Sequence, residues 1–161
     1  MERTIQLRPI GLVQTNGHEF SVQINPEFIP ALQRLDDFGY ANLYWWCHES
    51  DQTDLRKLTV ERKPYTKGPE TVGIFATRSP RRPNPIAVSP VMLLDIDHRH
   101  GIITIPWVDA LHTSPVIDIK PYTPSLDRVR QAKTPAWCDH WPKWHEDSAS
   151  FDWEAEFENA E

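Results

Sequence analysis

The apolar positions of this chain fall in many short runs. Phe20, Val22 and Ile24 alternate with polar residues, as in a half-buried strand, whereas residues 40–47 are almost continuously aromatic or apolar, as in a strand buried on both faces. Further apolar runs occupy residues 5–7, 10–13, 72–76, 86–96, 102–107 and 116–122. The pattern predicts strands in the number and spacing of a small antiparallel β-barrel.

Helices are expected to be short. Asn25 and Pro26 suit the N-cap and the first position of a helix ending near residue 35, which Pro30 must kink or split. Thr134 and Pro135 suit the start of a second helix. The chain has fifteen prolines and only six glycines, a balance that favours a mainly β fold whose strands are joined by stiff loops.

The C-terminal part of the chain is rich in tryptophan. Trp137, Trp141 and Trp144 would share one helical face, which Pro142 interrupts. For such a stripe, packing in a core or at an interface is favoured over stacking on nucleic-acid bases.

Charge is distributed unevenly along the chain. The formal net charge is −6, and residues 146–161 hold seven acidic groups with no Lys or Arg, so the remainder is nearly neutral. We therefore divide the sequence into a β-barrel domain, residues 1–145, and an acidic tail. Apolar and acidic residues alternate from 151 to 158, as in an edge strand or an arm lying on a partner subunit. An anionic partner is compatible with this distribution because fields act locally.

Length and cysteine content indicate a single reduced domain. The 161 residues suffice for one core, and no apolar stretch reaches the roughly 20 residues that span a bilayer. Residues 1–4 lack the apolar core of a signal peptide, so we expect a cytoplasmic protein with no membrane partner. Cys47 and Cys138 lie far apart among aromatic residues, as expected of buried free thiols.

The sequence lacks the motifs of several nucleotide-binding enzymes and of metal sites. The chain lacks the Gly-x-Gly-x-x-Gly and Walker sequences, which argues against a Rossmann methyltransferase, a dinucleotide enzyme and a P-loop ATPase. Cys138, His140 and His145 lack a closed four-ligand spacing, as do His98 and His100. No metal site is therefore expected.

Residues 73–89 hold the strongest candidate site. An apolar run breaks into a loop that carries Arg78, Arg81, Arg82 and three prolines within eight residues, and apolar sequence resumes at Ile86. Proline restricts its own backbone and that of the preceding residue, so the loop holds its side chains in place. Because guanidinium forks suit phosphate or carboxylate, the loop is interpreted as an anion-binding site or as a rigid solvated turn.

Four segments resemble the TrmO (TsaA-like) family. They are GIFATRSP at 73–80, RPNPI at 82–86, PVIDIKPY at 115–122, and the first-strand sequence at 9–13. They occur in the family's order and together cover most of residues 5–125. The resemblance implies an S-adenosylmethionine-dependent methyltransferase built on a small antiparallel β-barrel, usually dimeric, with the cofactor near the subunit interface. The family's best-known activity is N6-methylation of threonylcarbamoyl-adenosine next to the anticodon of tRNA.

The resemblance also implies site residues. For binding S-adenosylmethionine these are His48, Glu49, Arg78, Val88, Ser89, Leu111, His112, Thr113 and Ser114. For contacting the acceptor or accepting its proton they are Asp118, Lys120 and Tyr122, with a structural ion pair as the alternative for Asp118. For binding the acceptor they are Arg81, Arg82 and Asn84, with holding the loop as the alternative for the two arginines.

The chain departs from the family pattern in several places. Ala87 replaces the glycine of the family's Asn-Pro-Ile-Gly, and residues 112–115, His-Thr-Ser-Pro, replace its Asp-Gly-Thr-Pro. Residues 14–17 are all that corresponds to a longer segment with Gln-Pro-Gly, and the further C-terminal domain of some members has no obvious counterpart. The acceptor therefore has alternatives to tRNA, namely another RNA or a small molecule. A non-enzymatic S-adenosylmethionine-binding adaptor is the further alternative.

The resemblance predicts a homodimer. Light scattering at micromolar concentration is expected to give the mass of two chains, because cyclic dimers are the commonest closed assembly. A monomeric mass would contradict this prediction.

Overall fold

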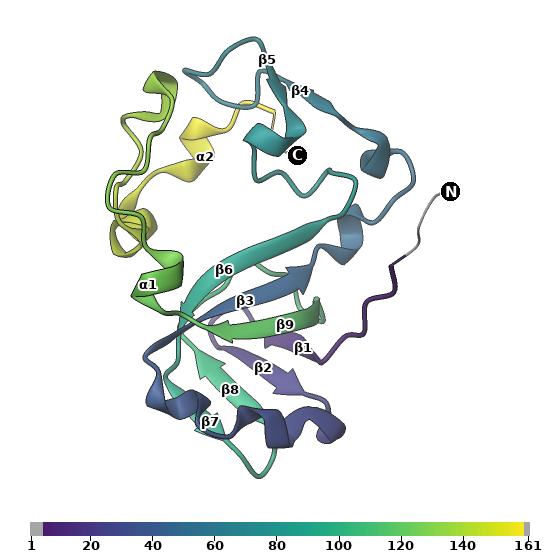
Figure 1. Ribbon diagram of the computed structural model, residues 1–161. Coiled ribbons are helices and arrows are strands. Elements are labelled where there is room, and N and C mark those ends of the chain that lie inside the picture. The colour runs from purple at the N-terminus through teal and green to yellow at the C-terminus, as the bar shows by residue number, and fades with distance from the viewer. Residues whose placement is uncertain (1–4, 160–161) are drawn as a thin grey trace. The chain divides into compact units, whose positions relative to one another are not determined.

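The computed structural model describes residues 5–159 (Figure 1). Within this range the chain forms two compact units. Unit 1 comprises residues up to Asp51 together with Asn84–Arg128, and unit 2 comprises Gln52–Pro83 together with the residues from Val129 onward. The Trp-rich segment and the acidic residues that follow it thus belong to the same unit.

Unit 1 is built on one antiparallel sheet, which confirms the mainly β prediction. Its strand order is β6-β3-β9-β1-β2-β8-β7. The strands are β1 (Gly11–Thr15), β2 (Phe20–Ile24), β3 (Tyr40–Trp46), β6 (Ile86–Met92), β7 (Asp95–Asp97), β8 (Ile102–Ile105) and β9 (Pro115–Pro121).

The predicted barrel is not found as a closed structure. In the described residues β6 and β7 are the two edge strands, and no pairing joins them. Only Leu93 and Leu94 separate these strands in sequence. The Leu93 N–H donates to the Gly39 carbonyl beside β3, and the Leu94 N–H donates to Thr104 in β8, each at 2.9 Å. The chain thus turns a corner between the two edges of an open, antiparallel sheet.

The core of unit 1 lies on one face of this sheet. Val13, Val22, Leu43, Ile103 and Val116 are each at most 2% exposed and pack together. Alternation along β3 directs its odd-numbered residues into this core and its even-numbered residues to the opposite face. On that opposite face Asn42 is buried and the other residues are partly buried, so the predicted burial of β3 on both faces is confirmed only in part.

The short helices follow the proline signals. The predicted start at Pro26 is confirmed, but Pro30 leaves a 3-10 helix, η1 (Pro26–Leu32), followed by a second one, η2 (Leu35–Asp37). Unit 1 also contains η3 (His48–Ser50) and a single α-helical turn, α1 (Pro124–Asp127).

Unit 2 contains a small hairpin and several helical turns. The hairpin pairs β4 (Val60–Arg62) with β5 (Thr71–Gly73). The helical turns are η4 (Leu55–Lys57), η5 (Ile74–Ala76), η6 (Ala136–Cys138), η7 (His145–Ser150) and α2 (Trp153–Glu156). The expectation of an edge strand or a partner-directed arm at 151–158 is corrected, because these residues form α2 and a single bridge from Phe157 to Tyr65.

Aromatic side chains form the core of unit 2, which confirms the core interpretation for Trp137 and Trp141 but not for Trp144, which is 57% exposed. Tyr65 stacks on Trp137 with ring centroids 5.0 Å apart and meets Trp141 edge-on at 5.1 Å. Trp153 and Phe157 extend the cluster, stacking at 5.8 Å. The C-terminal segment is therefore held by aromatic packing against the residues that follow β4.

A buried carboxylate is enclosed in this aromatic core. Glu156 is 4% exposed, and its Oε2 accepts a hydrogen bond from Thr66 at 3.1 Å and pairs with His140 Nε2 at 2.8 Å. Burial raises the pKa of Glu156, but the hydrogen bonds with His140 and Thr66 oppose this effect, and the net pKa is lowered. Glu156 is thus retained as an anion within the apolar cluster.

Gly11 leaves no room for a side chain. A Cβ atom on Gly11 would lie 2.3 Å from the backbone oxygen of Gln23 in β2. We expect Gly11→Ala to lower the free energy of unfolding by about 1–3 kcal/mol, because the clash involves backbone that cannot rotate away. Chemical denaturation measures this. Gly39→Ala is the control, since a Cβ atom on Gly39 would meet no non-adjacent residue within 4 Å, and equal losses in both variants would contradict the prediction.

Candidate functional site

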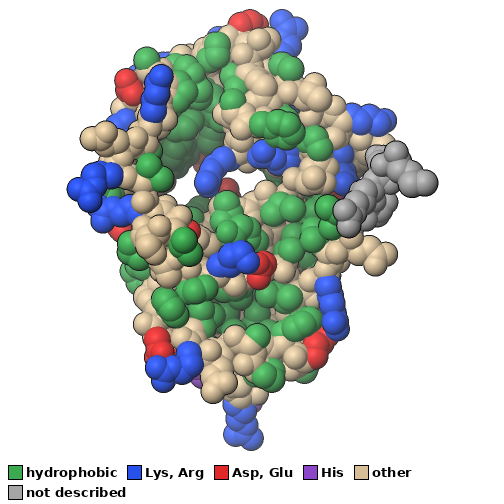
Figure 2. Space-filling view, viewed as in Figure 1, with side chains coloured by type: hydrophobic (Ala, Val, Ile, Leu, Met, Phe, Trp, Pro, Cys, Tyr) green, Lys and Arg blue, Asp and Glu red, His purple; other side chains and the backbone are tan. Residues whose placement is uncertain are grey.

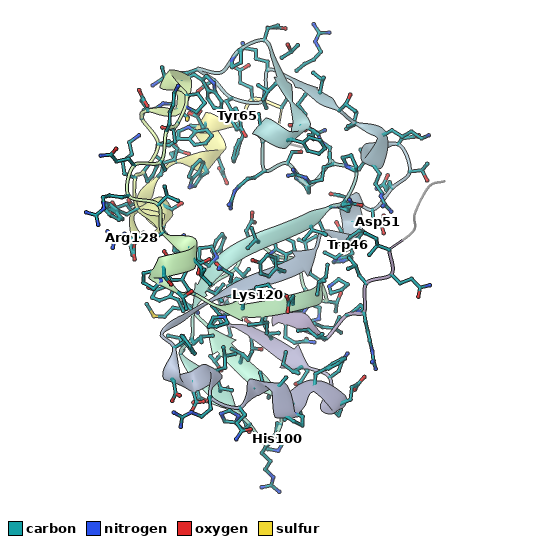
Figure 3. All side chains as sticks on the ribbon, viewed as in Figure 1. Trp46, Asp51, Tyr65, His100, Lys120 and Arg128 are labelled. Atoms are coloured by element: carbon teal, nitrogen blue, oxygen red, sulfur yellow. The ribbon has the colours of Figure 1, made fainter. Side chains whose placement is uncertain are left out.

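Four strands of unit 1 meet at one end of the sheet. There β3 and β1 end while β6 and β9 begin, since Trp46 pairs with Ile86, Trp45 with Val116, and Leu12 with Pro115. Figure 3 marks this end by the labelled Trp46 and Asp51, whose Nε1 and Oδ2 atoms form a 3.1 Å hydrogen bond. Antiparallel pairing therefore gathers segments that lie far apart in sequence.

The first predicted pair, His48 and Glu49, follows β3 at this end. Both lie in η3, and the chain is held there because the Cys47 N–H donates to the Pro85 carbonyl at 2.8 Å. His48 Nδ1 lies 3.3 Å from the Ser114 hydroxyl oxygen, a contact between residues 66 positions apart. Ser114 is 1% exposed, so this contact is largely sheltered from solvent.

The loop 111–114 is a tight turn attached to β1. The Thr113 N–H donates to the Val13 carbonyl at 2.8 Å, and the Ser114 N–H donates to the Leu111 carbonyl at 3.1 Å. The Thr15 N–H donates to His112 Nδ1 at 3.2 Å. The structure thus brings His48 together with Ser114, and it fixes His112 against the end of β1. We call His48, Glu49 and residues 111–114 the sheet-end site.

The predicted residues Val88 and Ser89 lie further along β6. Val88 is paired with Tyr44 and Ser89 with Leu43, so the two side chains point to opposite faces of the sheet. The Ser89 hydroxyl accepts a 3.4 Å hydrogen bond from the Trp45 indole on the core face. Only the backbone of these residues, or the Val88 side chain, can therefore face a ligand on the outer surface.

A β-bulge on β9 determines where Asp118 and Lys120 point. Tyr44 pairs with Asp118 whereas the next residue, Trp45, pairs with Val116, so Ile117 is the extra residue. The Asp118 carboxylate and the Lys120 ammonium form an ion pair on the outer face, where Figure 3 labels Lys120 on β9. Figure 2 shows a basic and an acidic side chain side by side among hydrophobic ones over this part of the sheet.

The three predicted catalytic residues do not converge. Hydrogen bonding to Asp118 raises the pKa of Lys120, so its amine stays protonated at neutral pH and cannot accept a proton. Asp118 also accepts the Ile119 N–H at 2.9 Å. Tyr122 lies beside Tyr40, with ring centroids 6.5 Å apart, at the far end of β3 from the sheet-end site. Asp118 and Lys120 therefore form a pair, and Tyr122 packs beside Tyr40 two positions further along the chain.

The arginines of the central motif lie in unit 2. Arg81 pairs with Glu61, its NH2 lying 3.1 Å from Oε1. Arg82 NH1 donates to the backbone oxygens of Thr77 at 3.3 Å and Ser79 at 3.4 Å. Both guanidinium groups thus have partners near or within the loop itself.

Arg78 and Asn84 flank these arginines on either side. The backbone of Arg78 hydrogen-bonds with Tyr65, which lowers the pKa of the Tyr65 phenol. Burial of the phenol has the larger, opposite effect, so the net pKa of Tyr65 is raised. Asn84 begins the second segment of unit 1, where its carbonyl accepts the Ile86 N–H at 2.7 Å. The binding roles of both residues stay predictions.

Sequence reasoning missed Glu61. Its carboxylate accepts the Ser79 hydroxyl at 2.8 Å in addition to the Arg81 contact, and the residue is 9% exposed. The available signal was that Glu61 is the single acidic residue between positions 55 and 69, a segment rich in Lys and Arg. An isolated acid in such a segment indicates a specific cationic partner.

A cavity of about 370 Å³ lies on the flank of β9, away from the sheet-end site. Its lining includes Phe28, Leu32, Phe38, Asp118 and Ile119. A second hollow of about 480 Å³ lies beside η1 and η2. Neither lining contains His48 or Ser114, so the candidate site rests on the convergence of side chains from distant segments and not on a cavity.

Residues 5–159 contain neither a candidate metal-binding group nor a candidate membrane-spanning helix. No group of three His, Cys, Asp or Glu residues there could hold a metal ion. In that same range no helix has both the length and the apolar character needed to cross a bilayer.

Comparison with known proteins defines the class. A family model described as the tRNA-methyltransferase O N-terminal domain matches residues 6–128. The chain is 33% identical over 139 residues to a "Probable S-adenosyl-L-methionine-binding protein" of Methanothermobacter thermautotrophicus, covering 78% of this chain and 95% of the relative. It is 34% identical over 115 residues to the "Putative S-adenosylmethionine-dependent methyltransferase RcsF" of Pseudomonas aeruginosa, covering 70% and 48%.

The structural comparison agrees with the sequence comparison. A crystal structure of TrmO from Pseudomonas aeruginosa superposes with a TM-score of 0.65 at 25% identity, covering 84% of this chain and 62% of that one. The fold is thus that of an antiparallel β domain found in a tRNA methyltransferase. The chain belongs to the TrmO family. It spans less than two thirds of the solved TrmO chain, and residues after 128 lie outside the family match.

Thr113 has a backbone conformation that favours glycine. Its φ is +65°, which β-branched residues adopt with strain, and the family resemblance implies a glycine at this position. We expect Thr113→Gly to raise the free energy of unfolding by about 0.5–1 kcal/mol, because relief of strain exceeds the added entropy of the unfolded chain. Thermal unfolding measures this. Thr113→Ala, which keeps the strained backbone, should give no gain, and a gain of the same size would contradict the explanation.

Proposed function

We propose that this protein is an S-adenosylmethionine-dependent methyltransferase that binds its cofactor at the sheet-end site. The single observation that carries the proposal is the convergence of His48 and Ser114 at 3.3 Å. These residues come from the two loops that the family resemblance assigns to the cofactor. The names of the relatives, which are S-adenosylmethionine-binding proteins and a putative methyltransferase, support the same ligand.

The side chains at the sheet end suit this ligand. Imidazole, hydroxyl and backbone groups can hydrogen-bond the adenine and ribose, and the carboxylate of Glu49 complements the ammonium or sulfonium. Arg78 lies in unit 2, and binding of the ligand's carboxylate is the role that the family resemblance implies for it. When bound, the cofactor supplies an electrophilic methyl group. Methyl transfer is an in-line displacement, so the protein accelerates it mainly by holding donor and acceptor in position.

For the acceptor, we propose threonylcarbamoyl-adenosine next to the anticodon of tRNA. The match to the N-terminal domain of tRNA-methyltransferase O supports this choice. Lys120, protonated beside Asp118, is suited to contact a phosphate or a carboxylate of the acceptor and not to remove a proton. Asp118, Tyr122 and Asn84 are the further acceptor contacts in this proposal.

A binding protein without catalysis is the second candidate. The relative from Methanothermobacter thermautotrophicus is named only as an S-adenosylmethionine-binding protein, and that name favours ligand binding over a specific reaction. Binding of the cofactor without methyl incorporation into tRNA, another RNA or a small molecule would support this candidate.

Calorimetry with S-adenosylmethionine tests the cofactor. We expect His48→Ala to weaken binding about ten-fold, which corresponds to the loss of one or two hydrogen bonds. Arg78→Ala should abolish binding with little change in melting temperature. His98→Ala is the matched control, because His98 is a half-exposed histidine whose partner is Asp36 at 3.4 Å. Absence of heat release from the unmodified protein at near-millimolar ligand would contradict the proposal.

A methyl-incorporation assay on total tRNA tests the acceptor. Nucleoside mass spectrometry is expected to detect N6-methylated threonylcarbamoyl-adenosine, with the Arg78→Ala protein as the inactive control. Cofactor binding without this product, and without affinity for tRNA at low salt, would contradict tRNA as the acceptor and leave the cofactor assignment intact.

A further inference from the structure

We propose that Glu61 is the positioning residue of the central motif, and that the C-terminal segment completes its network so that Arg78 is presented for cofactor binding. This inference rests on the proposed function. It assigns a role in ligand binding to β4 and to residues 158–159, of which the latter lie outside the part of the chain that matches the family.

The Glu61 carboxylate accepts two hydrogen bonds from the motif loop. Its Oε1 accepts the Ser79 hydroxyl at 2.8 Å and Arg81 Nε at 3.2 Å, and the ion pair brings Arg81 NH2 to 3.1 Å from the same oxygen. Glu61 is 9% exposed, and the Arg81 side chain is 26% exposed. A carboxylate this well covered is retained only with such donors, so the pairing fixes the loop to β4.

Hydrogen bonds within the loop extend this fixation to both neighbours of Arg78. The Thr77 hydroxyl donates to the Ile74 carbonyl at 2.9 Å and accepts the Ser79 N–H at 3.2 Å. The Ser79 hydroxyl in turn accepts the Arg81 N–H at 3.3 Å. Residues 77, 79 and 81 thus form one connected chain that ends on Glu61, and the backbone on either side of Arg78 is held in place.

Arg82 strengthens the same loop from its other side. Its NH1 donates to the carbonyls of Thr77 and Ser79, which flank Arg78. Arg81 and Arg82 therefore have the loop-holding role that the sequence left open as an alternative to acceptor binding. The conformation of the motif depends on these charged contacts as well as on its prolines.

The C-terminal segment closes the network. Arg81 NH2 donates to the Asn159 carbonyl at 2.8 Å, and Asn159 Nδ2 donates to the carbonyls of Arg62 at 3.0 Å and Lys63 at 2.9 Å. Lys63 pairs with Glu158 at 2.9 Å, which raises the pKa of the Lys63 amine. Residues 158–159 are thus tied both to the hairpin and to the motif arginine.

Cofactor affinity measured by calorimetry separates positioning from mere folding. We expect Glu61→Ala to raise the Kd for S-adenosylhomocysteine about ten-fold or more, since displacement of a binding group by about 1 Å has effects of this size. Glu61→Gln keeps an acceptor oxygen for Ser79 and should lose less affinity. Glu70→Ala is the matched control, because Glu70 lies just before β5 and pairs with Arg62 at 3.5 Å with its side chain 70% exposed.

A chain ending at Glu158 tests the C-terminal contribution. Loss of the Asn159 contacts is expected to weaken ligand binding several-fold, as Arg81→Ala does. The double variant should lose less binding free energy than the sum of the two single losses. Near-ultraviolet circular dichroism of the aromatic core verifies that unit 2 is folded in each variant.

The outcomes distinguish this inference from the proposed function. If the unmodified protein binds ligand, and folded Glu61→Ala, Arg81→Ala and truncated proteins bind it with unchanged Kd, the positioning role is wrong and the cofactor assignment stands. If the unmodified protein binds no ligand, the proposed function fails, and this inference fails with it.

Discussion

The pairing of β9 with both β3 and β1 is the constraint on which unit 1 depends. It joins residues near position 45 to residues near 116, and residues 11–12 to residues 115–116, across long stretches of chain. Because the strands are antiparallel, this pairing brings the end of β3 and the loop before β9 to the same end of the sheet. The 3.3 Å contact between His48 and Ser114 is a direct consequence, and one bulge on β9 then directs Asp118 to the outer face.

Unit 2 is held together by a different kind of interaction. Its hairpin has only two short strands, which are marginal without further packing. Stacking of Tyr65 on Trp137 and of Trp153 on Phe157 supplies that packing, and the buried ions Glu61 and Glu156 each have specific donors. The acidic residues of the C-terminal segment are therefore not one uniform charged surface. Some bind cations of the same unit, and one lies within the aromatic core.

Much of the fold was accessible from the sequence because its signals are local. Alternation along residues 20–24 predicted a half-buried strand, and proline at position 26 predicted the start of η1, both of which the structure confirms. Closure of a barrel was not predictable in this way, because it depends on whether two edge strands meet. The prediction of an edge strand at 151–158 was wrong because alternation over a few residues is also compatible with a short helical turn. That turn is followed by Phe157, whose ring packs on Tyr65.

The sequence by itself determined the family, the mainly β character and the stiffness of the central motif, since these depend on residue order and on proline. Only the tertiary structure decided which polar groups meet. It paired His48 with Ser114, placed Tyr122 beside Tyr40, and gave Arg81 the partner Glu61 twenty positions away. The physical reason is that strand register, a bulge and burial determine side-chain contacts, and these depend on segments distant in sequence that no local pattern specifies.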